Sequence, residues 1–91
     1  MKKEKPYLLE FYGDDCPHCE RMREITLEIE KEEGVVFERL EVWNSVKNDA
    51  LMHELAKNGC DGVPYFYNKK THESICGETN YKKLKAWATK S

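Results

Sequence analysis

The amino-acid sequence predicts an α/β fold in which three helices flank a four-stranded mixed sheet, in the order βαβαββα. Two observations carry this prediction. An apolar run, an amphipathic segment and a second apolar run follow one another between residues 7 and 42, which indicates two parallel strands joined by a helix. Further along, a short polar turn separates two strand-like runs and indicates an antiparallel hairpin. At 91 residues, we expect one domain, residues 1–91, with a modest core.

The first half of the chain supplies two strands and a long helix. Aromatic and branched side chains predict a strand over residues 7–12. A helix over residues 17–32 is expected to begin at Pro17, whose fixed φ is already helical, and to end before Gly34, which adopts a left-handed backbone at little cost. Its apolar side chains recur at helical spacing: Met22, Ile25 and Ile29. A second strand is expected over residues 35–42.

The second half is expected to form a helix, a hairpin and a final helix. Asn44 or Ser45 is expected to cap a helix over residues 45–58, which Asn58 and Gly59 would end. Its predicted core stripe consists of Val46, Leu51 and Leu55. Strands over residues 64–68 and 73–76 enclose a polar turn. The last helix, over residues 80–89, would be capped by Thr79 or Asn80 and turn Leu84 and Trp87 toward the core.

The segment Cys16-Pro17-His18-Cys19 places two thiols two residues apart, after a strand and at the start of a helix. This arrangement favours a reversible disulfide. Unpaired N–H groups and the positive end of the helix dipole favour an anion at this place. We therefore expect Cys16 to be the nucleophile and Cys19, one turn inside the helix, to be the resolving thiol.

His18 lies between the two cysteines, where its positive charge or its N–H would stabilise a thiolate and make the disulfide a better oxidant. The alternative is an exposed histidine of little effect. Asp14 and Asp15 precede Cys16 and act in the opposite direction, because their negative charges disfavour a neighbouring thiolate.

Glu10 is a carboxylate in a nearly continuous apolar strand. Burial of such a group is costly unless it is paired or protonated, so a raised pKa is expected. Arg39 on the second predicted strand is available, and we expect the two side chains to interact beneath Cys19. The alternative is a glutamate at a strand edge that faces water.

The run Leu9-Glu10-Phe11-Tyr12, followed by Cys16-Pro17-His18-Cys19, resembles the thioredoxin superfamily over residues 7–89, and Cys-Pro-His-Cys is the tetrapeptide of DsbA-like disulfide oxidases. Gly62-Val63-Pro64 resembles the cis-proline loop of that superfamily, and Gly77 resembles the glycine that opens its last helix. The resemblance implies a cis peptide bond before Pro64, which would face Cys16. It also implies that the backbone of Val63 binds an extended substrate by β-addition.

The same resemblance implies that Glu10 shuttles a proton to or from Cys19. It also marks a departure, since Asp14 and Asp15 occupy places where these proteins usually carry aromatic side chains. The expected function is thiol–disulfide exchange with protein disulfides through a mixed disulfide. The expected partners are protein disulfides or dithiols and a recycling redox partner, and no bound cofactor is required.

Two alternatives stay open at this stage. A glutaredoxin-like, glutathione-dependent reductase is the nearest, although the turn Gly77-Glu78-Thr79-Asn80 departs from the Gly-Gly-x-Asp type that this family uses for glutathione. The other is a binding module without catalytic activity, in which the thiols serve structure or hold a metal. Reactivity of Cys16 and metal content would separate the module from the enzyme.

Cys60 and Cys76 are not needed for a mechanism that uses one cysteine pair. We expect them to be buried free thiols, with a second disulfide as the main alternative because sequence does not determine connectivity. Zinc or an iron–sulfur cluster is the third possibility, but Cys60 and Cys76 lack paired ligand spacing, so no metal site is expected.

Composition excludes several classes of function. The formal net charge of −2 and a pI near 5.9 argue against a nucleic-acid partner. No stretch approaches the roughly 20 apolar residues of a membrane span, so no membrane partner is expected. The basic start of the chain lacks the apolar segment of a secretory signal, and we expect a cytoplasmic monomer. Earlier removal of an export signal stays open.

Overall fold

The computed structural model describes residues 6–57, 59–60 and 62–90. Its sheet has the strand order β2-β1-β3-β4. The strands are β1 (Leu8–Tyr12), β2 (Phe37–Glu41), β3 (Tyr65–Asn68) and β4 (Ser74–Cys76). β1 runs parallel to β2 and antiparallel to β3, and β3 pairs antiparallel with β4. The predicted mixed sheet, with its parallel pair and its hairpin, is therefore confirmed.

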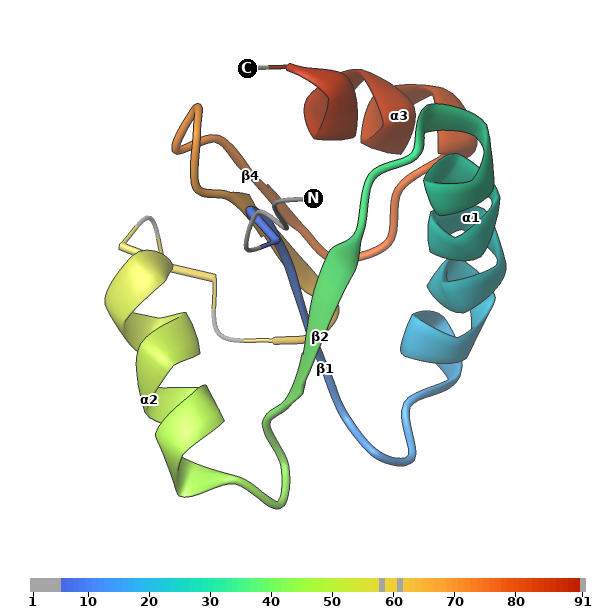
Figure 1. Cartoon of the computed structure of the whole chain (residues 1–91). Coiled ribbons are helices and arrows are strands. Elements are labelled where there is room, and N and C mark those ends of the chain that lie inside the picture. Colours follow the sequence, from blue (N-terminus) through green and yellow to red (C-terminus); the bar gives the residue numbers. More distant parts are fainter. Residues whose placement is uncertain (1–5, 58, 61, 91) are drawn as a thin grey trace, which may run out of the picture.

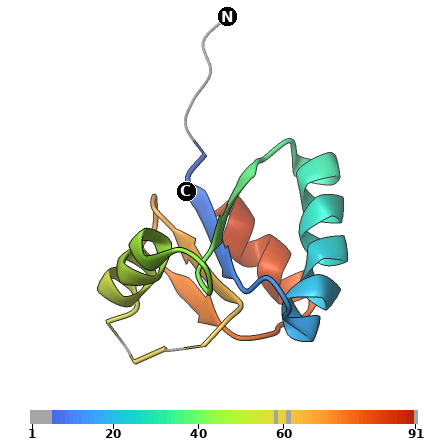
Figure 2. The ribbon, with the colours of Figure 1, turned by 90° about the horizontal axis from the view of Figure 1, so that it is seen from below.

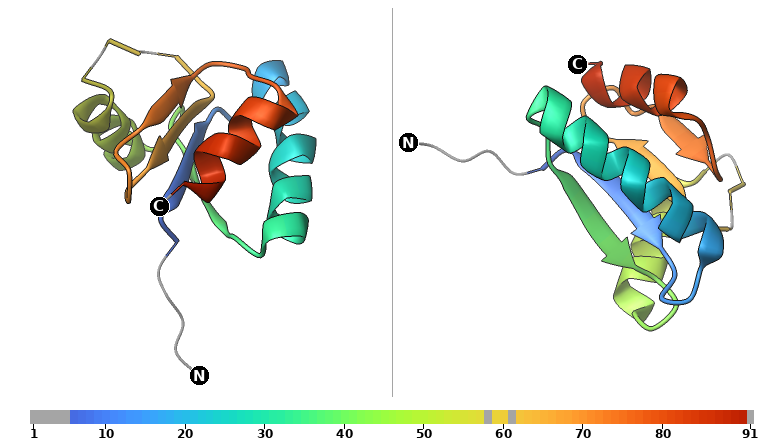
Figure 3. Two further views of the ribbon diagram at one scale, coloured as in Figure 1. Left: turned by 90° about the horizontal axis from the view of Figure 1, so that it is seen from above. Right: turned by 90° about the vertical axis from the view of Figure 1, so that its right-hand side faces the viewer.

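The helices are α1 (Pro17–Glu33), α2 (Val46–Leu55) and α3 (Tyr81–Thr89). In Figures 1 and 2, α2 covers one face of the sheet, and α1 and α3 cover the other. Figure 3 shows α1 and α3 lying side by side. None of these helices in the described part of the chain is long and apolar enough to cross a membrane.

A separate apolar cluster fills the space on each face of the sheet. The buried residues on the α1 and α3 side are Leu8, Met22, Ile29, Phe37, Phe66, Leu84, Trp87 and Ala88. Those on the α2 side are Leu9, Phe11, Val42, Met52, Ala56, Cys60 and Tyr65. Neighbouring β1 residues enter opposite clusters because successive side chains of a strand point to opposite faces. Both clusters hold β1 in place, and β1 leads directly into the cysteine motif.

The ends of the helices follow the predicted capping residues. Ser45 and Asn80 are the N-caps of α2 and α3, and their side chains accept hydrogen bonds from the backbone N–H groups of Asn48 and Lys83. Gly34 ends α1 with a φ of 69°, and its N–H donates to the carbonyl oxygen of Glu30 at 2.9 Å.

Two expectations about α2 are wrong. The helix ends at Leu55 with Ala56 as its C-cap, earlier than the predicted end at 58; Asn58 lies outside the described residues. Val46 is 87% exposed, and Met52 is the buried residue of this helix. The cause is the helical period: at about 100° per residue, Val46 and Leu55 lie on opposite faces.

Candidate active site

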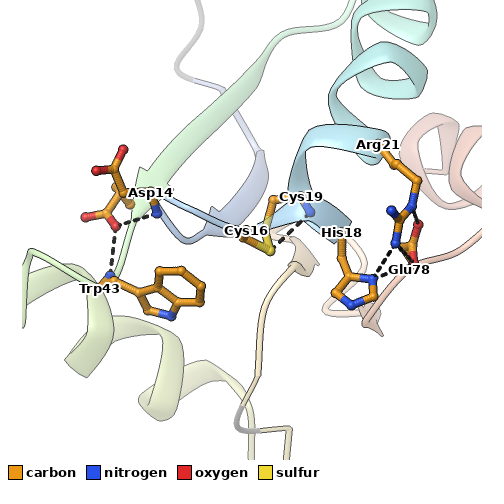
Figure 4. The surroundings of a disulfide bond; sticks show 8 residues. Asp14, Cys16, His18, Cys19, Arg21, Trp43 and Glu78 are labelled. Carbon is orange, nitrogen blue, oxygen red and sulfur yellow. Dashed lines mark hydrogen bonds and ion pairs between the residues drawn. A yellow bond between two sulfur atoms is a disulfide. The ribbon is translucent and has the colours of Figure 1, made fainter.

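Cys16 and Cys19 form a disulfide at the start of α1, with 5.2 Å between their Cα atoms. Cys16 is the N-cap of the helix, and its Sγ accepts a hydrogen bond from the backbone N–H of Cys19 at 3.1 Å (Figure 4). Pro17 occupies the first helical turn, where its missing N–H leaves no donor unpaired. A backbone donor therefore points at the sulfur of Cys16, where it would stabilise a thiolate after reduction.

Exposure does not distinguish the two cysteines in this oxidised state, because each is only 3% exposed. The expected position of Cys19, one turn inside the helix, therefore gives it no lower exposure than Cys16. In this oxidised state the Sγ atom of Cys16 is bonded to Cys19, and both cysteines are buried. What sets Cys16 apart is its position at the N-cap.

Glu10 and Arg39 face each other across β1 and β2, in register. The Nε atom of Arg39 lies 3.1 Å from Oε1 of Glu10, and the Glu10 side chain has no exposed surface. The distance allows an ion pair, although neither oxygen of Glu10 accepts an aligned hydrogen bond from the described residues. Burial raises the pKa of Glu10, and the charge of Arg39 opposes this shift without cancelling it.

The guanidinium of Arg39 is shared with α1. Its Nη2 donates to Oγ1 of Thr26 at 2.8 Å and approaches Oε1 of Glu30 at 3.4 Å. Since Arg39 divides its charge between two carboxylates, it neutralises Glu10 only in part. The guanidinium of Arg39 therefore lies between the sheet and α1, the helix that carries Cys19.

His18 belongs to an exposed network on one side of the disulfide. Its Nδ1 lies 2.8 Å from Oε1 of Glu78 and 2.8 Å from Nη2 of Arg21. One nitrogen cannot both donate to Glu78 and accept from Arg21, so the protonated Nδ1 would pair with Glu78 and the unprotonated one with Arg21. Nε of Arg21 donates to Oε2 of Glu78 at 2.7 Å in addition.

Glu78 follows β4 and carries the negative charge of this network. Hydrogen bonds from Arg21 and then from His18 lower the pKa of Glu78 to about 2. The carboxylate is therefore ionised at neutral pH, where it partly compensates the charge of Arg21. The predicted role of His18 must be considered together with Glu78, which the sequence analysis did not assign to the site.

The loop before β3 carries Val63 and Pro64, and the peptide bond between them is cis. The carbonyl oxygen of Pro64 accepts a hydrogen bond from the N–H of Gly77 at 2.8 Å. This bond ties the Pro64 loop to the segment after β4, where Gly77 has a φ of 92°. Gly77 and Glu78 are neighbours, so the Pro64 loop is linked to the network around His18.

The expectation that Cys60 and Cys76 are free thiols is wrong: they form a second disulfide, with 5.9 Å between their Cα atoms. Cys76 pairs with Tyr65 in the β3–β4 hairpin, and this register brings it next to the chain that enters β3. Cys60 is 7% exposed, whereas Cys76 is exposed. Among the described residues, no group of three His, Cys, Asp or Glu side chains is placed to hold a metal ion.

Trp43 is a residue at this site that the sequence analysis missed. It lies in the loop between β2 and α2, on the side of the disulfide opposite to His18 (Figure 4). Its ring packs on the backbone of Gly13, and it remains 55% exposed. The only available signal was an aromatic residue directly after a predicted strand, which by itself does not separate a core residue from a surface one.

Comparison with known proteins gives one kind of match. No protein-family model matches the chain, and no curated protein matches it. Among solved structures, the crystal structure of a glutaredoxin from Archaeoglobus fulgidus is similar, with a TM-score of 0.65 and 26% sequence identity. The match covers 93% of this chain and 88% of that chain.

This chain has the fold of the thioredoxin superfamily. Its fold is like that of a glutaredoxin, and Cys16 and Cys19 have the CxxC spacing of a redox-active pair. Together, fold and spacing support a thiol–disulfide oxidoreductase in general, with protein or glutathione redox partners. In this fold, Cys16 and Cys19 lie at the start of α1, shortly after β1 ends.

Proposed function

We propose that this protein exchanges its Cys16–Cys19 pair with disulfides and dithiols of client proteins through a mixed disulfide. The observation that supports this most directly is the backbone N–H of Cys19, which lies 3.1 Å from the Sγ atom of Cys16 at the start of α1. A donor at this place favours the thiolate of Cys16, and the thiolate is the attacking species.

In the reducing direction, the thiolate of Cys16 attacks one sulfur of the client disulfide and releases the other as a thiolate. The thiolate of Cys19 then attacks the Sγ atom of Cys16 and releases the second client thiol. Cys16 and Cys19 end as the disulfide, having given two electrons to the client. In the oxidising direction the same steps run in reverse. Neither direction requires a bound organic cofactor.

Glu10 is proposed to serve Cys19 in this sequence. Cys19 must lose its proton before it attacks, and a buried acid with a raised pKa accepts a proton near neutral pH more readily than an ordinary glutamate. Arg39 would keep part of the Glu10 population ionised for this purpose. Replacement of Glu10 by glutamine should slow resolution and change its pH dependence. An unchanged pH–rate profile would eliminate this role.

His18 is proposed to stabilise the Cys16 thiolate, as the likeness to DsbA-like oxidases implies. The presence of Glu78 and Arg21 modifies this idea, because the cations near Cys16 are partly compensated. A cation beside the thiolate stabilises the reduced form and makes the disulfide more oxidising. The loop of Val63 and Pro64 is proposed to hold the client segment through the backbone of Val63.

Glutathione is the second candidate partner, because the similar solved structure is that of a glutaredoxin. The acidic residues beside Cys16 count against it, since glutathione is itself an anion. The turn of Gly77-Glu78-Thr79-Asn80 also departs from the glutathione-binding turn expected for that family.

The mixed disulfide can be trapped with a Cys19→Ser variant, which retains the nucleophile and lacks the resolving thiol. We expect this variant to form a stable 1:1 covalent adduct with a disulfide-bonded peptide, and to release the peptide on addition of dithiothreitol. Adduct formation with glutathione disulfide, measured in parallel, compares the two partner classes.

The matched control is Cys16→Ser, which retains Cys19 alone. It should form the adduct much more slowly, since Cys19 lies inside the first turn of the helix. Absence of any adduct in the Cys19→Ser variant would overturn the proposed exchange, and equal rates in the two variants would overturn the assignment of Cys16 as nucleophile.

A further inference from the structure

We propose that Trp43, Asp14 and Asp15 form a binding subsite beside the disulfide for a positively charged side chain of the client. The occupant is an extended polypeptide segment in which arginine or lysine lies next to the disulfide-bonded cysteine. This inference rests on the proposed exchange function and names the class of client that the site selects.

The ring of Trp43 lies directly on the backbone of Gly13. A Cβ atom built on Gly13 would come within 2.4 Å of the Cδ2 and Cε2 atoms of the ring, closer than any real contact. The glycine is needed for this close approach and not for its backbone angles, since its φ is outside the left-handed region. The ring is thus seated on the loop that leads from β1 to Cys16.

The carboxylate of Glu41 holds this arrangement together. It accepts hydrogen bonds from the backbone N–H groups of Asp14 at 3.0 Å, Trp43 at 3.0 Å and Asn44 at 2.9 Å. The loop after β1 and the loop after β2 are therefore fixed to each other through one side chain. A binding surface that is ordered before the client arrives loses less conformational entropy on binding.

Trp43 still exposes 55% of its surface in this fixed position. Single exposed apolar residues are common and need no explanation by themselves. The location is what matters here: the ring packs on Gly13, three residues before the cysteine that the client must reach, and Figure 4 shows it beside the disulfide. Tryptophan in such a place is a frequent anchor of protein interfaces.

Asp14 and Asp15 put two negative charges on the loop between Gly13 and Cys16. Asp14 and Asp15 are exposed, and neither has an ion-pair partner within 4.0 Å among the described residues. Of the cations on α1, Arg21 is paired with Glu78, and Arg23 lies 5.4 Å from the centre of the Tyr12 ring and lines a pocket with Asp14. An incoming cation would therefore meet two carboxylates that form no ion pair with the described residues.

An arginine or lysine side chain satisfies both parts of this surface. Its methylene groups pack on an aromatic face, its charge is attracted to the π-electrons of tryptophan, and its head group reaches carboxylates nearby. An anionic segment would be repelled by the same aspartates. The subsite thus favours basic protein segments over glutathione.

The test measures how fast the protein, with Cys16 and Cys19 reduced, reacts with each of three disulfide substrates. Two are peptides of equal length that differ only in arginine or glutamate next to the disulfide-bonded cysteine; the third is hydroxyethyl disulfide, which is small and uncharged. We expect kcat/KM for the arginine peptide to exceed that for the glutamate peptide about tenfold, mainly through KM. The preference should fall as salt screens the aspartates.

Trp43→Ala and the double variant Asp14→Asn, Asp15→Asn should each lower this preference to about threefold or less. Val36→Ala is the matched control, because Val36 is 58% exposed and precedes β2 at the opposite end of that strand from Trp43. It should keep the wild-type preference. Equal kcat/KM values for the two peptides, a preference for glutamate, or an unchanged preference in Trp43→Ala would overturn the subsite.

Exchange with hydroxyethyl disulfide tests the proposed thiol–disulfide exchange separately from the proposed subsite. Turnover of the small disulfide without a peptide preference would contradict the subsite alone, whereas no turnover of any of the three would contradict the exchange function.

A second measurement does not depend on replacing Trp43. Trp87 is only 4% exposed, so acrylamide quenches mainly the fluorescence of Trp43. In the Cys19→Ser variant, a mixed disulfide with the arginine peptide should lower the quenching constant about twofold relative to a mixed disulfide with mercaptoethanol. Equal quenching in the two adducts would show that the client does not cover Trp43.

Discussion

The guanidinium of Arg39 lies 3.1 Å from a carboxylate of Glu10 that has no exposed surface. This pair joins the two parallel strands on the face that α1 covers. The positive charge of Arg39 favours the ionised form of Glu10, which burial disfavours. Burial has the larger effect, so the pKa of Glu10 stays raised. Both the stability of the protein and its chemistry should therefore depend on the protonation of Glu10.

The first prediction concerns stability and pH. The raised pKa of Glu10 means that the folded protein binds this proton more tightly than the unfolded chain does. The resulting stabilisation is present below the ordinary value of 4.5 and is lost as the pH rises through the raised value. Since glutamine does not ionise, wild type should lose free energy of unfolding relative to Glu10→Gln as the pH rises toward neutral.

Urea unfolding of both oxidised proteins at a series of pH values measures this difference directly. A difference that stays constant with pH, or that moves in favour of wild type at higher pH, would contradict the raised pKa. The variant Arg39→Gln extends the test, because loss of the cation should shift the titration of Glu10 to still higher pH.

The second prediction concerns Glu78. Replacing Glu78 by glutamine removes the negative charge that pairs with Arg21 and contacts His18, so the potential around the cysteine pair becomes more positive and should stabilise the reduced form more strongly. We expect the potential of the Cys16–Cys19 couple to become less negative by about 10–30 mV, a small shift because the network is exposed to solvent.

Equilibration with a graded glutathione buffer measures the potential. Glu73→Gln is the control, since Glu73 is an exposed carboxylate paired with Lys90 at the end of the hairpin. A shift no larger than that of the control, or one toward a more reducing potential, would mean that Glu78 does not tune the pair.

The third prediction concerns the second disulfide. Cys60 and Cys76 are separated by 16 positions, so in the chain-entropy model their bond stabilises the fold by about 3 kcal/mol. The double variant Cys60→Ser, Cys76→Ser should lose about this much free energy of unfolding. For Cys16→Ser, Cys19→Ser, with a separation of 3, the same model gives about 1.6 kcal/mol.

Chemical unfolding of both double variants under oxidising conditions gives the comparison. An equal loss in the two, or no loss on removing the second disulfide, would show that the longer bond does not constrain the unfolded chain.

Much of the fold was predictable because it depends on local chemistry. The ends of the helices are set by backbone and capping preferences that act within a few residues, at Pro17, Gly34, Ser45 and Asn80. The cysteine motif and the Glu10–Arg39 pair were also accessible, because a strand followed by a helix and a charge in an apolar strand are patterns of sequence.

Other features depend on long-range contacts that no local pattern encodes. The pairing of Cys60 with Cys76 follows from the β3–β4 register and not from the spacing of the cysteines. Val46 was assigned to the core by its apolar character, although its helical position directs it to solvent. The contact of Trp43 with Gly13 depends on the pairing of β1 with β2, the two strands that these residues follow.

The fourth prediction concerns Gly13. In Gly13→Ala, the new Cβ atom would collide with the ring of Trp43 and displace it, at a cost of about 1–3 kcal/mol in stability. The variant should lose the preference for the arginine peptide as Trp43→Ala does. Because both changes act through the same contact, the double variant should lose no more selectivity than either one alone. Additive losses would show that the two residues act independently.

The central claim is that the start of α1 keeps the sulfur of Cys16 anionic when the pair is reduced. The most direct measurement is the rate of alkylation of Cys16 by iodoacetamide in the Cys19→Ser variant, as a function of pH. We expect Cys16 to react at neutral pH at least about tenfold faster than the thiol of an unstructured cysteine peptide, and the rate to level off well below about pH 8.5. A rate no faster than that of the peptide, rising through the same pH range, would contradict the claim.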